Sequence, residues 1–184
     1  MTTASSRDQS HRFPRVRQWA LACAICLCAA ATATDALAQK RAPMLVFAQE
    51  APPPTLDPYF STSVSTRNVA MHMFETLVTR DENNAIVPDL ADKITEAPDG
   101  LSYTFTLRRG VKFHNGQEMT SADVKASFER YQRVALQKVI LAPVSAIETP
   151  DAYTVVLRLS RKVPVFLDEM SSFVTPLAIL PASQ

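Results

Sequence analysis

The sequence predicts a mixed α/β domain behind a secretory leader, and three patterns carry this prediction. Residues 101–107 alternate apolar and polar side chains, which is typical of a strand with one buried face. Residues 120–131 follow with apolar side chains at helical spacing and a helix start signal at Thr120. Residues 19–33 form a short apolar run behind an arginine-rich start. A strand and a helix in close succession favour the mixed class, and the leader predicts export.

The first 38 residues have the three parts of a signal peptide. Four arginines precede the apolar run 19–33, and Ala36-Leu37-Ala38 supplies an A-x-A cleavage site. The alternative, a membrane anchor, is disfavoured because a span needs about 20 apolar residues. A lipid-anchored precursor is also disfavoured, because none of the three cysteines follows a suitable run of small residues. We therefore predict a signal peptide over 1–38 and a secreted, soluble product that begins at Gln39.

Cleavage would change the chemistry that remains available. The three cysteines, Cys23, Cys26 and Cys28, all lie in the leader, so the product would hold no thiol for a disulfide, a metal or a nucleophile. Fifteen basic and sixteen acidic residues would remain, a net charge of −1. This balance offers no attraction to nucleic acid or to an anionic membrane. Residues 39–184 suffice for one domain with its own core.

The first half of the product is predicted as strand, loop, helix and hairpin. The apolar run 44–49 is typical of a buried strand, and the prolines of 51–58 favour an extended loop. A helix is predicted from Ser65, because three apolar residues follow at every fourth position (Val69, Met73 and Leu77). Short strands over 76–79 and 85–87 then flank a polar turn at Asp81–Asn84.

The second half is predicted as strands around one helix. Asp99-Gly100 precedes the strand 101–107, and the alternation resumes at Val111 and Phe113. Thr120 and Asp123 form a capping-box pattern before a helix with Val124, Phe128 and Tyr131 on its apolar side. Two further strands are predicted over 145–149 and 153–159, joined by a turn at Pro150-Asp151.

Five motifs follow one another in an order typical of a known family. They are Leu56-Asp57-Pro58; Phe74–Val78 with Ile86–Ala91; Asp99–Arg108 with Gly110–Gly116; Thr120–Val124; and Ile147–Val155 with Pro164–Leu167. In this order they resemble the family 5 extracellular solute-binding proteins, which include dipeptide, oligopeptide, nickel and glutathione receptors. The stretch 103–116 is the most specific of the five, and the resemblance covers roughly residues 44–180.

The chain departs from the family pattern at two positions and in length. Ile94 stands where the family often has tryptophan, and the turn at Asn83-Asn84 lacks the usual glycine. Both changes concern structure and leave the resemblance intact. Family members are much longer and close two lobes on a solute, whereas this chain stops at Gln184. The sequence therefore reads as a fragment or a truncated frame.

The resemblance implies a periplasmic binding protein fold of type II, of which this chain holds the N-terminal part of the first lobe. Residues 39–80 would begin that lobe, and residues 81–172 would form its peripheral α/β subdomain. Residues 173–184 would return to the lobe, where the chain ends.

The function implied is that of a receptor. A peptide or similar solute would bind between the lobes, hinge closure would bury it, and the closed form would dock on the membrane subunits of an ABC importer. The resemblance implies no catalysis, and we expect no cofactor and no nucleic-acid partner. We also expect a monomer and no metal site, although the nickel-binding members of the family keep a metal as the alternative. The predicted ligand contacts lie after the first strand, where open α/β sheets bind ligands. They are Glu50, Asp57, Tyr59, Ser63 and Arg67. The alternative for Asp57-Pro58 is a purely structural role, in which these residues fix the turn of the loop and do not contact the solute.

Other polar residues have simpler interpretations. His72 and His114 make a poor zinc site unless carboxylates converge on them, so structural or exposed roles are expected. Arg108 falls on the polar side of its strand, and Asp168-Glu169 would diverge on a helix, so both are expected at solvated edges.

Two further functional hypotheses remain open. A secreted hydrolase would need a nucleophile, yet the sequence holds no G-x-S-x-G motif and the product no cysteine. A non-functional truncated remnant would leave sheet edges uncovered and would fold poorly. From the missing second lobe we expect that residues 39–184 alone do not bind a solute tightly.

Overall fold

The computed structural model describes residues 46, 48–174 and 176–183. The chain divides into two compact units between Ala48 and Gln49, and the second unit contains the helices and strands named below. The predicted signal peptide lies outside the described residues, as do three of the six residues of the predicted strand 44–49, and the three that are described (46, 48 and 49) do not form a strand. Within the described residues, no helix has the length and apolar character needed to cross a membrane.

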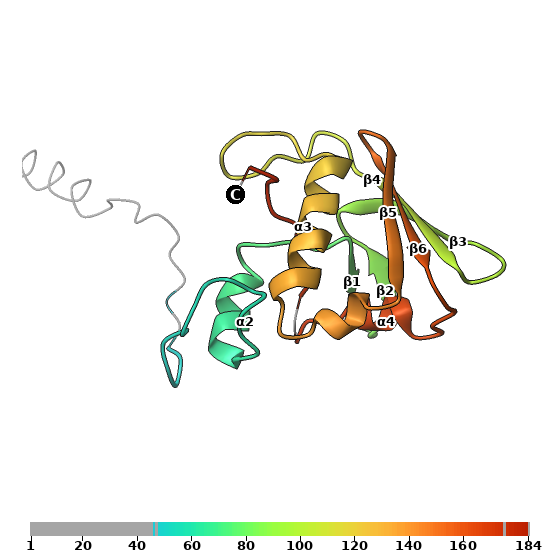
Figure 1. The fold of residues 1–184 in the computed structure, drawn as a ribbon. Helices are drawn as coiled ribbons and strands as arrows, with labels where there is room; N and C mark the ends of the chain where they lie inside the picture. Colours follow the sequence, from blue (N-terminus) through green and yellow to red (C-terminus); the bar gives the residue numbers. More distant parts are fainter. Residues whose placement is uncertain (1–45, 47, 175, 184) are drawn as a thin grey trace, which may run out of the picture. The chain divides into compact units, whose positions relative to one another are not determined.

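An antiparallel four-stranded sheet forms the centre of this unit (Figure 1). Its strands stand in the order β3-β4-β6-β5. The hairpin β3-β4 therefore forms one half of the sheet and the hairpin β5-β6 the other half. The strand bounds are β3 (Ala91–Glu96), β4 (Ser102–Leu107), β5 (Val144–Asp151) and β6 (Thr154–Leu159).

The predicted alternation in β4 and β6 is confirmed. Tyr103, Phe105 and Leu107 point to the inner face of the sheet and are 0–2 % exposed. The outer face is polar, and Arg158 there forms an ion pair with Glu148 across neighbouring strands, with 3.1 Å between Nε and Oε1. One polar and one apolar face make this sheet one layer of a two-layer structure.

Helix α3 (Ser121–Val134) covers the inner face of the sheet (Figure 1). The predicted capping box is present, because the Thr120 amide donates to Asp123 Oδ2 at 2.8 Å and the Thr120 hydroxyl lies 3.0 Å from the same oxygen. Val124 and Phe128 are fully buried, as their spacing predicts. The helix therefore begins and faces as the sequence indicates.

Two short elements beside the sheet were not predicted. The 3-10 helix η1 (Lys138–Leu141) follows α3, and only Leu141 of its four residues is buried. Helix α4 (Phe166–Met170) packs its Phe166 ring against the ring of Tyr103, with 5.2 Å between centroids. Both are too short for a periodic pattern to indicate them.

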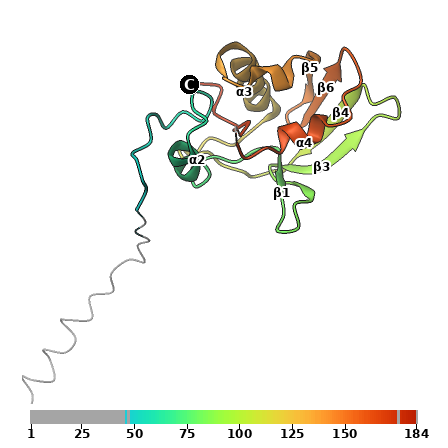
Figure 2. The ribbon, with the colours of Figure 1, turned by 90° about the horizontal axis from the view of Figure 1, so that it is seen from below.

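A separate hairpin projects away from the four-stranded sheet (Figure 2). It pairs β1 (Val78–Arg80) with β2 (Ile86–Pro88), close to the predicted strands. Asn84 in its turn has a φ of 63°, which asparagine tolerates better than most residues. Arg80 joins the hairpin to α4 through an ion pair with Asp168, with 2.8 Å between Nη2 and Oδ1.

Three predicted boundaries are corrected. The helix expected from Ser65 is α2 (Val64–Ala70), and Met73 lies beyond its end, 40 % exposed. The buried residues of α2 are Thr66 and Ala70. The apolar spacing that predicted a longer helix included Met73 and Leu77, which lie between the end of α2 and β1. The turn between β5 and β6 falls at Ala152-Tyr153, because Asp151 still pairs within the sheet. The residues from Val111 to Phe113 form one isolated bridge and no strand.

The last described segment, residues 176–183, packs alongside α3. Leu177, Ala178 and Ile179 are buried, and Ala178 forms an isolated bridge with Thr76. The amide of Leu180 donates to the Ser127 hydroxyl at 2.9 Å, and that of Ala182 to Asp123 Oδ1 at 2.9 Å. This return segment, as we call residues 176–183, belongs to the core of the second unit.

Candidate functional site

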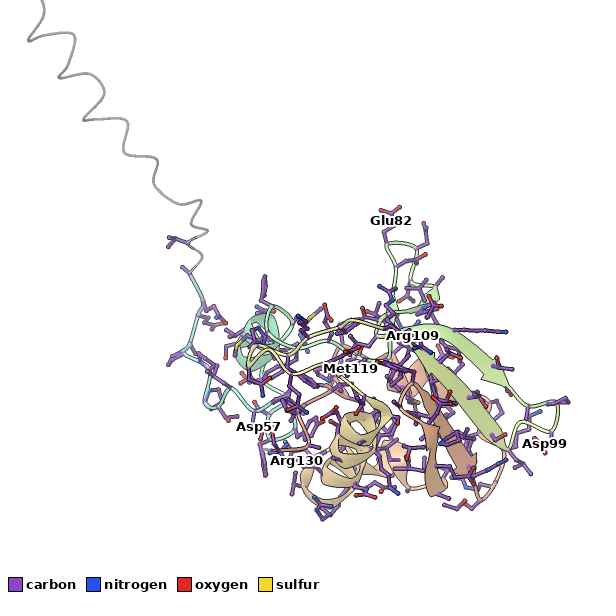
Figure 3. The ribbon with its side chains drawn as sticks, turned by 90° about the horizontal axis from the view of Figure 1, so that it is seen from above. Asp57, Glu82, Asp99, Arg109, Met119 and Arg130 are labelled. Atoms are coloured by element: carbon purple, nitrogen blue, oxygen red, sulfur yellow. The ribbon has the colours of Figure 1, made fainter. Side chains whose placement is uncertain are left out.

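One predicted site residue, Asp57, lies on the loop that precedes α2 and is paired with a residue of α3 that was not predicted. Asp57 pairs with Arg130 of α3, with 2.5 Å between Oδ2 and Nη2 (Figure 3). The two side chains retain 26 % and 29 % of their exposure. The hydrogen bond to Asp57 raises the pKa of Arg130, which therefore stays charged. The pair fixes the loop to the helix.

Tyr59 anchors the same loop in the core. Its side chain is 2 % exposed, and its hydroxyl donates to the carbonyl of Ala178 in the return segment. The ring meets the edge of the Tyr131 ring at 5.1 Å and lies 4.9 Å below the Arg130 guanidinium. Burial raises the pKa of Tyr59 above its ordinary value, although the charge of Arg130 opposes this shift. The loop is thus held from two sides.

Helix α2 continues from this loop and is tied to it. The carbonyl of Ser63 accepts the amide of Arg67 at 3.0 Å, and the hydroxyls of Ser63 and Ser65 lie 2.8 Å apart. The buried Thr66 hydroxyl donates to the carbonyl of Thr55 at 2.9 Å, which joins the helix to the start of the loop. Four of the five predicted residues therefore lie on one connected stretch, 55–67.

Two further predicted residues, Glu50 before this stretch and Arg67 at its end, have no ion-pair partner among the described residues. Glu50 is exposed at the start of the loop. The Arg67 guanidinium is half-buried and lies 5.7 Å from the centroid of the Phe173 ring. Phe173 is itself 53 % exposed. The structure does not bring Glu50 into the hydrogen-bonded cluster that holds Asp57 and Tyr59.

Exposed apolar side chains lie around the loop. Phe60 is 49 % exposed beneath Arg130, whose guanidinium is 5.9 Å from its ring. Leu136 is 58 % exposed, and its amide donates to the carbonyl of Tyr59 at 3.0 Å. Val64 at the start of α2 is also 58 % exposed. These exposed apolar side chains all lie on the loop, on α2 or just after α3. We call the surface formed by Phe60, Val64, Arg67, Leu136 and Phe173 the loop face.

Sequence reasoning missed three parts of this site. Arg130 lies 73 residues from Asp57, and nothing in the helical pattern of α3 singles it out. Leu136 and Phe173 are apolar residues in irregular segments, where no period distinguishes an exposed position from a buried one. The feature that distinguishes Leu136 and Phe173 is the exposure of their apolar side chains, and this can be read only from the folded structure.

The two histidines and the acidic pair lie away from the loop face. His72 and His114 line a cavity of about 590 Å³ beside the return segment, and His72 Nδ1 lies 2.6 Å from the carbonyl of Asn68. No group of three or more histidine, cysteine or acidic side chains in the described ranges is placed to hold a metal. Asp168 is more than a solvated edge, since it pairs with Arg80.

The described residues form a two-layer α/β unit with a loop fixed to α3 and exposed apolar side chains around that loop. Residues 85–183, more than half of the chain, match the family model of bacterial extracellular solute-binding proteins, family 5 Middle. The chain belongs to this family, as its motifs predict. Its fold is that of part of a periplasmic binding protein.

Three relatives illustrate the similarity. The chain is 41 % identical over 76 residues to the glutathione-binding protein GsiB of Salmonella choleraesuis, covering 41 % of this chain and 15 % of GsiB. It superposes on AgaA of A. tumefaciens R10 in complex with agropinic acid, with a TM-score of 0.66 and 37 % identity over 71 % of this chain and 27 % of AgaA. NikA of Brucella suis in complex with Fe(III)-EDTA gives a TM-score of 0.67 and 27 % identity, covering 78 % and 29 %. The chain thus spans less than a third of each relative.

Proposed function

We propose that this protein is the solute-binding component of an ABC importer and acts as a receptor without catalysis. Membership of the family supports a role in solute binding. The observation that carries the proposal is the clamp of Asp57 and Tyr59 by Arg130, which holds an ordered loop beneath exposed apolar side chains. A rigid loop binds a solute at little cost in conformational entropy.

The solute would meet the loop face at its apolar rim. Phe60, Val64 and Leu136 would supply apolar contact, while Ser63 and Arg67 would offer polar groups. Tyr59 would support the loop without touching the solute, because its side chain is buried and its hydroxyl already donates to the carbonyl of Ala178. Relatives are named for glutathione and for peptides, and AgaA is in complex with agropinic acid. We therefore propose a peptide or a similar small polar solute.

Calorimetry on the intact protein tests this proposal. The probes are glutathione, the tetrapeptide Ser-Thr-Ser-Ala and agropinic acid. We expect saturable binding of at least one of them, with the solute recovered unchanged by mass spectrometry. Chemical conversion of a probe would instead support the secreted hydrolase, and an absence of binding to all three would contradict the receptor.

Arg130→Met tests whether the clamp matters for binding, and Arg158→Met is its matched control. Both substitutions break an ion pair, but Arg158 pairs with Glu148 on the outer face of the sheet. We expect weaker solute binding only for Arg130→Met, because only that variant frees the loop. Equal affinities in the two variants would show that the loop face does not bind the solute.

The cellular context is part of the proposal. We propose that the signal peptide over 1–38 directs the protein to the periplasm, where it acts as a monomer beside the importer's membrane subunits. N-terminal sequencing of the exported product should begin at Gln39. A product that retains the leader would contradict the cleavage. Loss of solute uptake in a deletion strain, restored by the intact gene, would support the partnership with the importer.

A further inference from the structure

Arg67 differs from three other arginines that lie at the edges of the packed elements. It is also partly buried, whereas Arg109, which lies over the Tyr153 ring at 4.3 Å and has no ion pair among the described residues, is exposed. Arg80, Arg130 and Arg158 each form an ion pair with a carboxylate, at Asp168, Asp57 and Glu148 respectively. Within the described ranges Arg67 pairs with no carboxylate, and its guanidinium lies over the ring of Phe173. Because the residue is partly buried, an anionic partner is more favourable for its guanidinium than it would be in open water.

Among the described residues no hydrogen bond or ion pair joins the Arg67 side chain to an acid, although Glu75 and Asp89 line the same hollow as Phe173. Helix α2 has no acidic residue in its first turn. Asp57, the acid on the neighbouring loop, is already engaged by Arg130. Arg67 lies in the last turn of α2, where a positive charge gains a little from the helix dipole, but this effect is about 0.3–1 kcal/mol and needs no aromatic partner.

Phe173 orients the guanidinium rather than neutralising it. An aromatic ring attracts a guanidinium through its face and leaves the five N–H donors, which lie in the guanidinium plane, able to bond acceptors. Phe173 is 53 % exposed, so the contact lies at the surface of the loop face and not in the core. The planar fork of arginine matches the two oxygens of a carboxylate.

We propose that Arg67, oriented by Phe173, is a specificity-determining residue that binds a carboxylate of the solute. The solute class is then an acid with an apolar portion: the carboxylate meets Arg67, and the apolar portion contacts the rim at Phe60, Val64 and Leu136. This inference rests on the proposed function and narrows it, because neutral solutes and amides would lose the bond to Arg67.

Paired probes test the inference. The tetrapeptide Ser-Thr-Ser-Ala and its C-terminal amide differ only in the negative charge, and glutathione adds a second acid. Calorimetry on the intact protein should show about 10- to 100-fold tighter binding of the free acid, the range of a hydrogen bond to a charged group. Arg67→Gln should lose that preference and bind acid and amide alike.

Two further variants separate orientation from charge. Phe173→Leu keeps an apolar side chain but removes the ring, so it should reduce the preference for the acid without abolishing it. Arg158→Gln, on the outer face of the sheet, should bind both probes as the native protein does. Far-UV circular dichroism confirms that each variant is folded before its affinity is measured.

The outcomes separate this inference from the proposed function. If the native protein binds no probe, the receptor itself is wrong. If it binds the probes and Arg67→Gln keeps the native preference for the acid, the receptor stands and the role of Arg67 is wrong. Displacement of the peptide by inorganic phosphate more readily than by acetate would also overturn the assignment of a carboxylate.

Discussion

Removing the Arg130 guanidinium should destabilise the protein measurably, and the structure allows an estimate. A hydrogen bond to a charged group contributes about 1.5–3 kcal/mol, and each surface cation–π contact about 0.5–1 kcal/mol. Arg130 makes the bond to Asp57 and lies over the rings of Tyr59 and Phe60. The pair is 26–29 % exposed, so water screens part of the attraction. We expect Arg130→Met to lower the free energy of unfolding by about 2 kcal/mol.

A double-mutant cycle separates the ion pair from the stacking. Asp57→Asn removes the charge but keeps the oxygen that accepts the amide of Tyr59 at 2.9 Å. Asp57→Asn, Arg130→Met and the double variant should show a coupling energy of about 1 kcal/mol. Urea unfolding followed by far-UV circular dichroism suits this protein, because its one tryptophan, Trp19, lies in the predicted leader. Effects that add to within about 0.3 kcal/mol would refute the clamp.

Three other perturbations have outcomes set by the structure. Because burial raises the pKa of Tyr59 above its ordinary 10.0, the folded state keeps this proton when the unfolded chain releases it, so native stability should fall by up to about 1.4 kcal/mol per pH unit above about pH 10. Tyr59→Phe should show a smaller fall in urea unfolding at pH 9 and 11, because Tyr103 and Tyr153, whose pKa values are also raised, still contribute; identical pH slopes would contradict it. Asp123→Ala should cost about 2–3 kcal/mol and speed amide exchange at Ala182, because the side chain both caps α3 and accepts that amide; unchanged exchange would show that the return segment is held elsewhere. Gly100→Ala should cost about 1 kcal/mol because of its φ of +69°, much as Gly110→Ala should, since the added Cβ would meet only the exposed, flexible side chain of Lys162, which can move aside; a clearly larger loss in a thermal melt would show that Lys162 is held in place.

The parts of the fold that the sequence predicted are those with one buried face. β4, β6 and α3 each bury a regular set of side chains, so a local period was enough to identify them. β3 was missed because it is an edge strand whose exposed residues include Asp92, Lys93 and Glu96. Its strand conformation comes from pairing with β4, which no local pattern records. Edge strands with charged side chains are a common protection against aggregation.

The candidate site was predicted in part. Prolines and the Leu56-Asp57-Pro58 motif indicated the loop and two residues of its cluster, Asp57 and Tyr59. The partner of Asp57 was not predictable, because the chain has nineteen lysines and arginines and the pairing depends on how α3 packs. The burial of Tyr59 was not predictable either, since it depends on the return segment far along the chain. Local rules place the loop, and tertiary packing decides which of its side chains face a solute.

The return segment couples the loop face to the core. It accepts the hydroxyl of Tyr59 at Ala178, and it is held in turn by Ser127 and Asp123 of α3. Ser127 is buried, and its hydroxyl accepts the amide of Leu180 in the return segment. A substitution at Ser127 would therefore disturb the loop through the backbone of that segment. The hypothesis of a remnant rested on uncovered sheet edges and core surface. The return segment covers part of the core with Leu177–Ile179, while β3 and β5 remain at the edges of the sheet. The physical ground for poor folding is weakened to that extent, and the loop's order depends on contacts that the remnant hypothesis did not include.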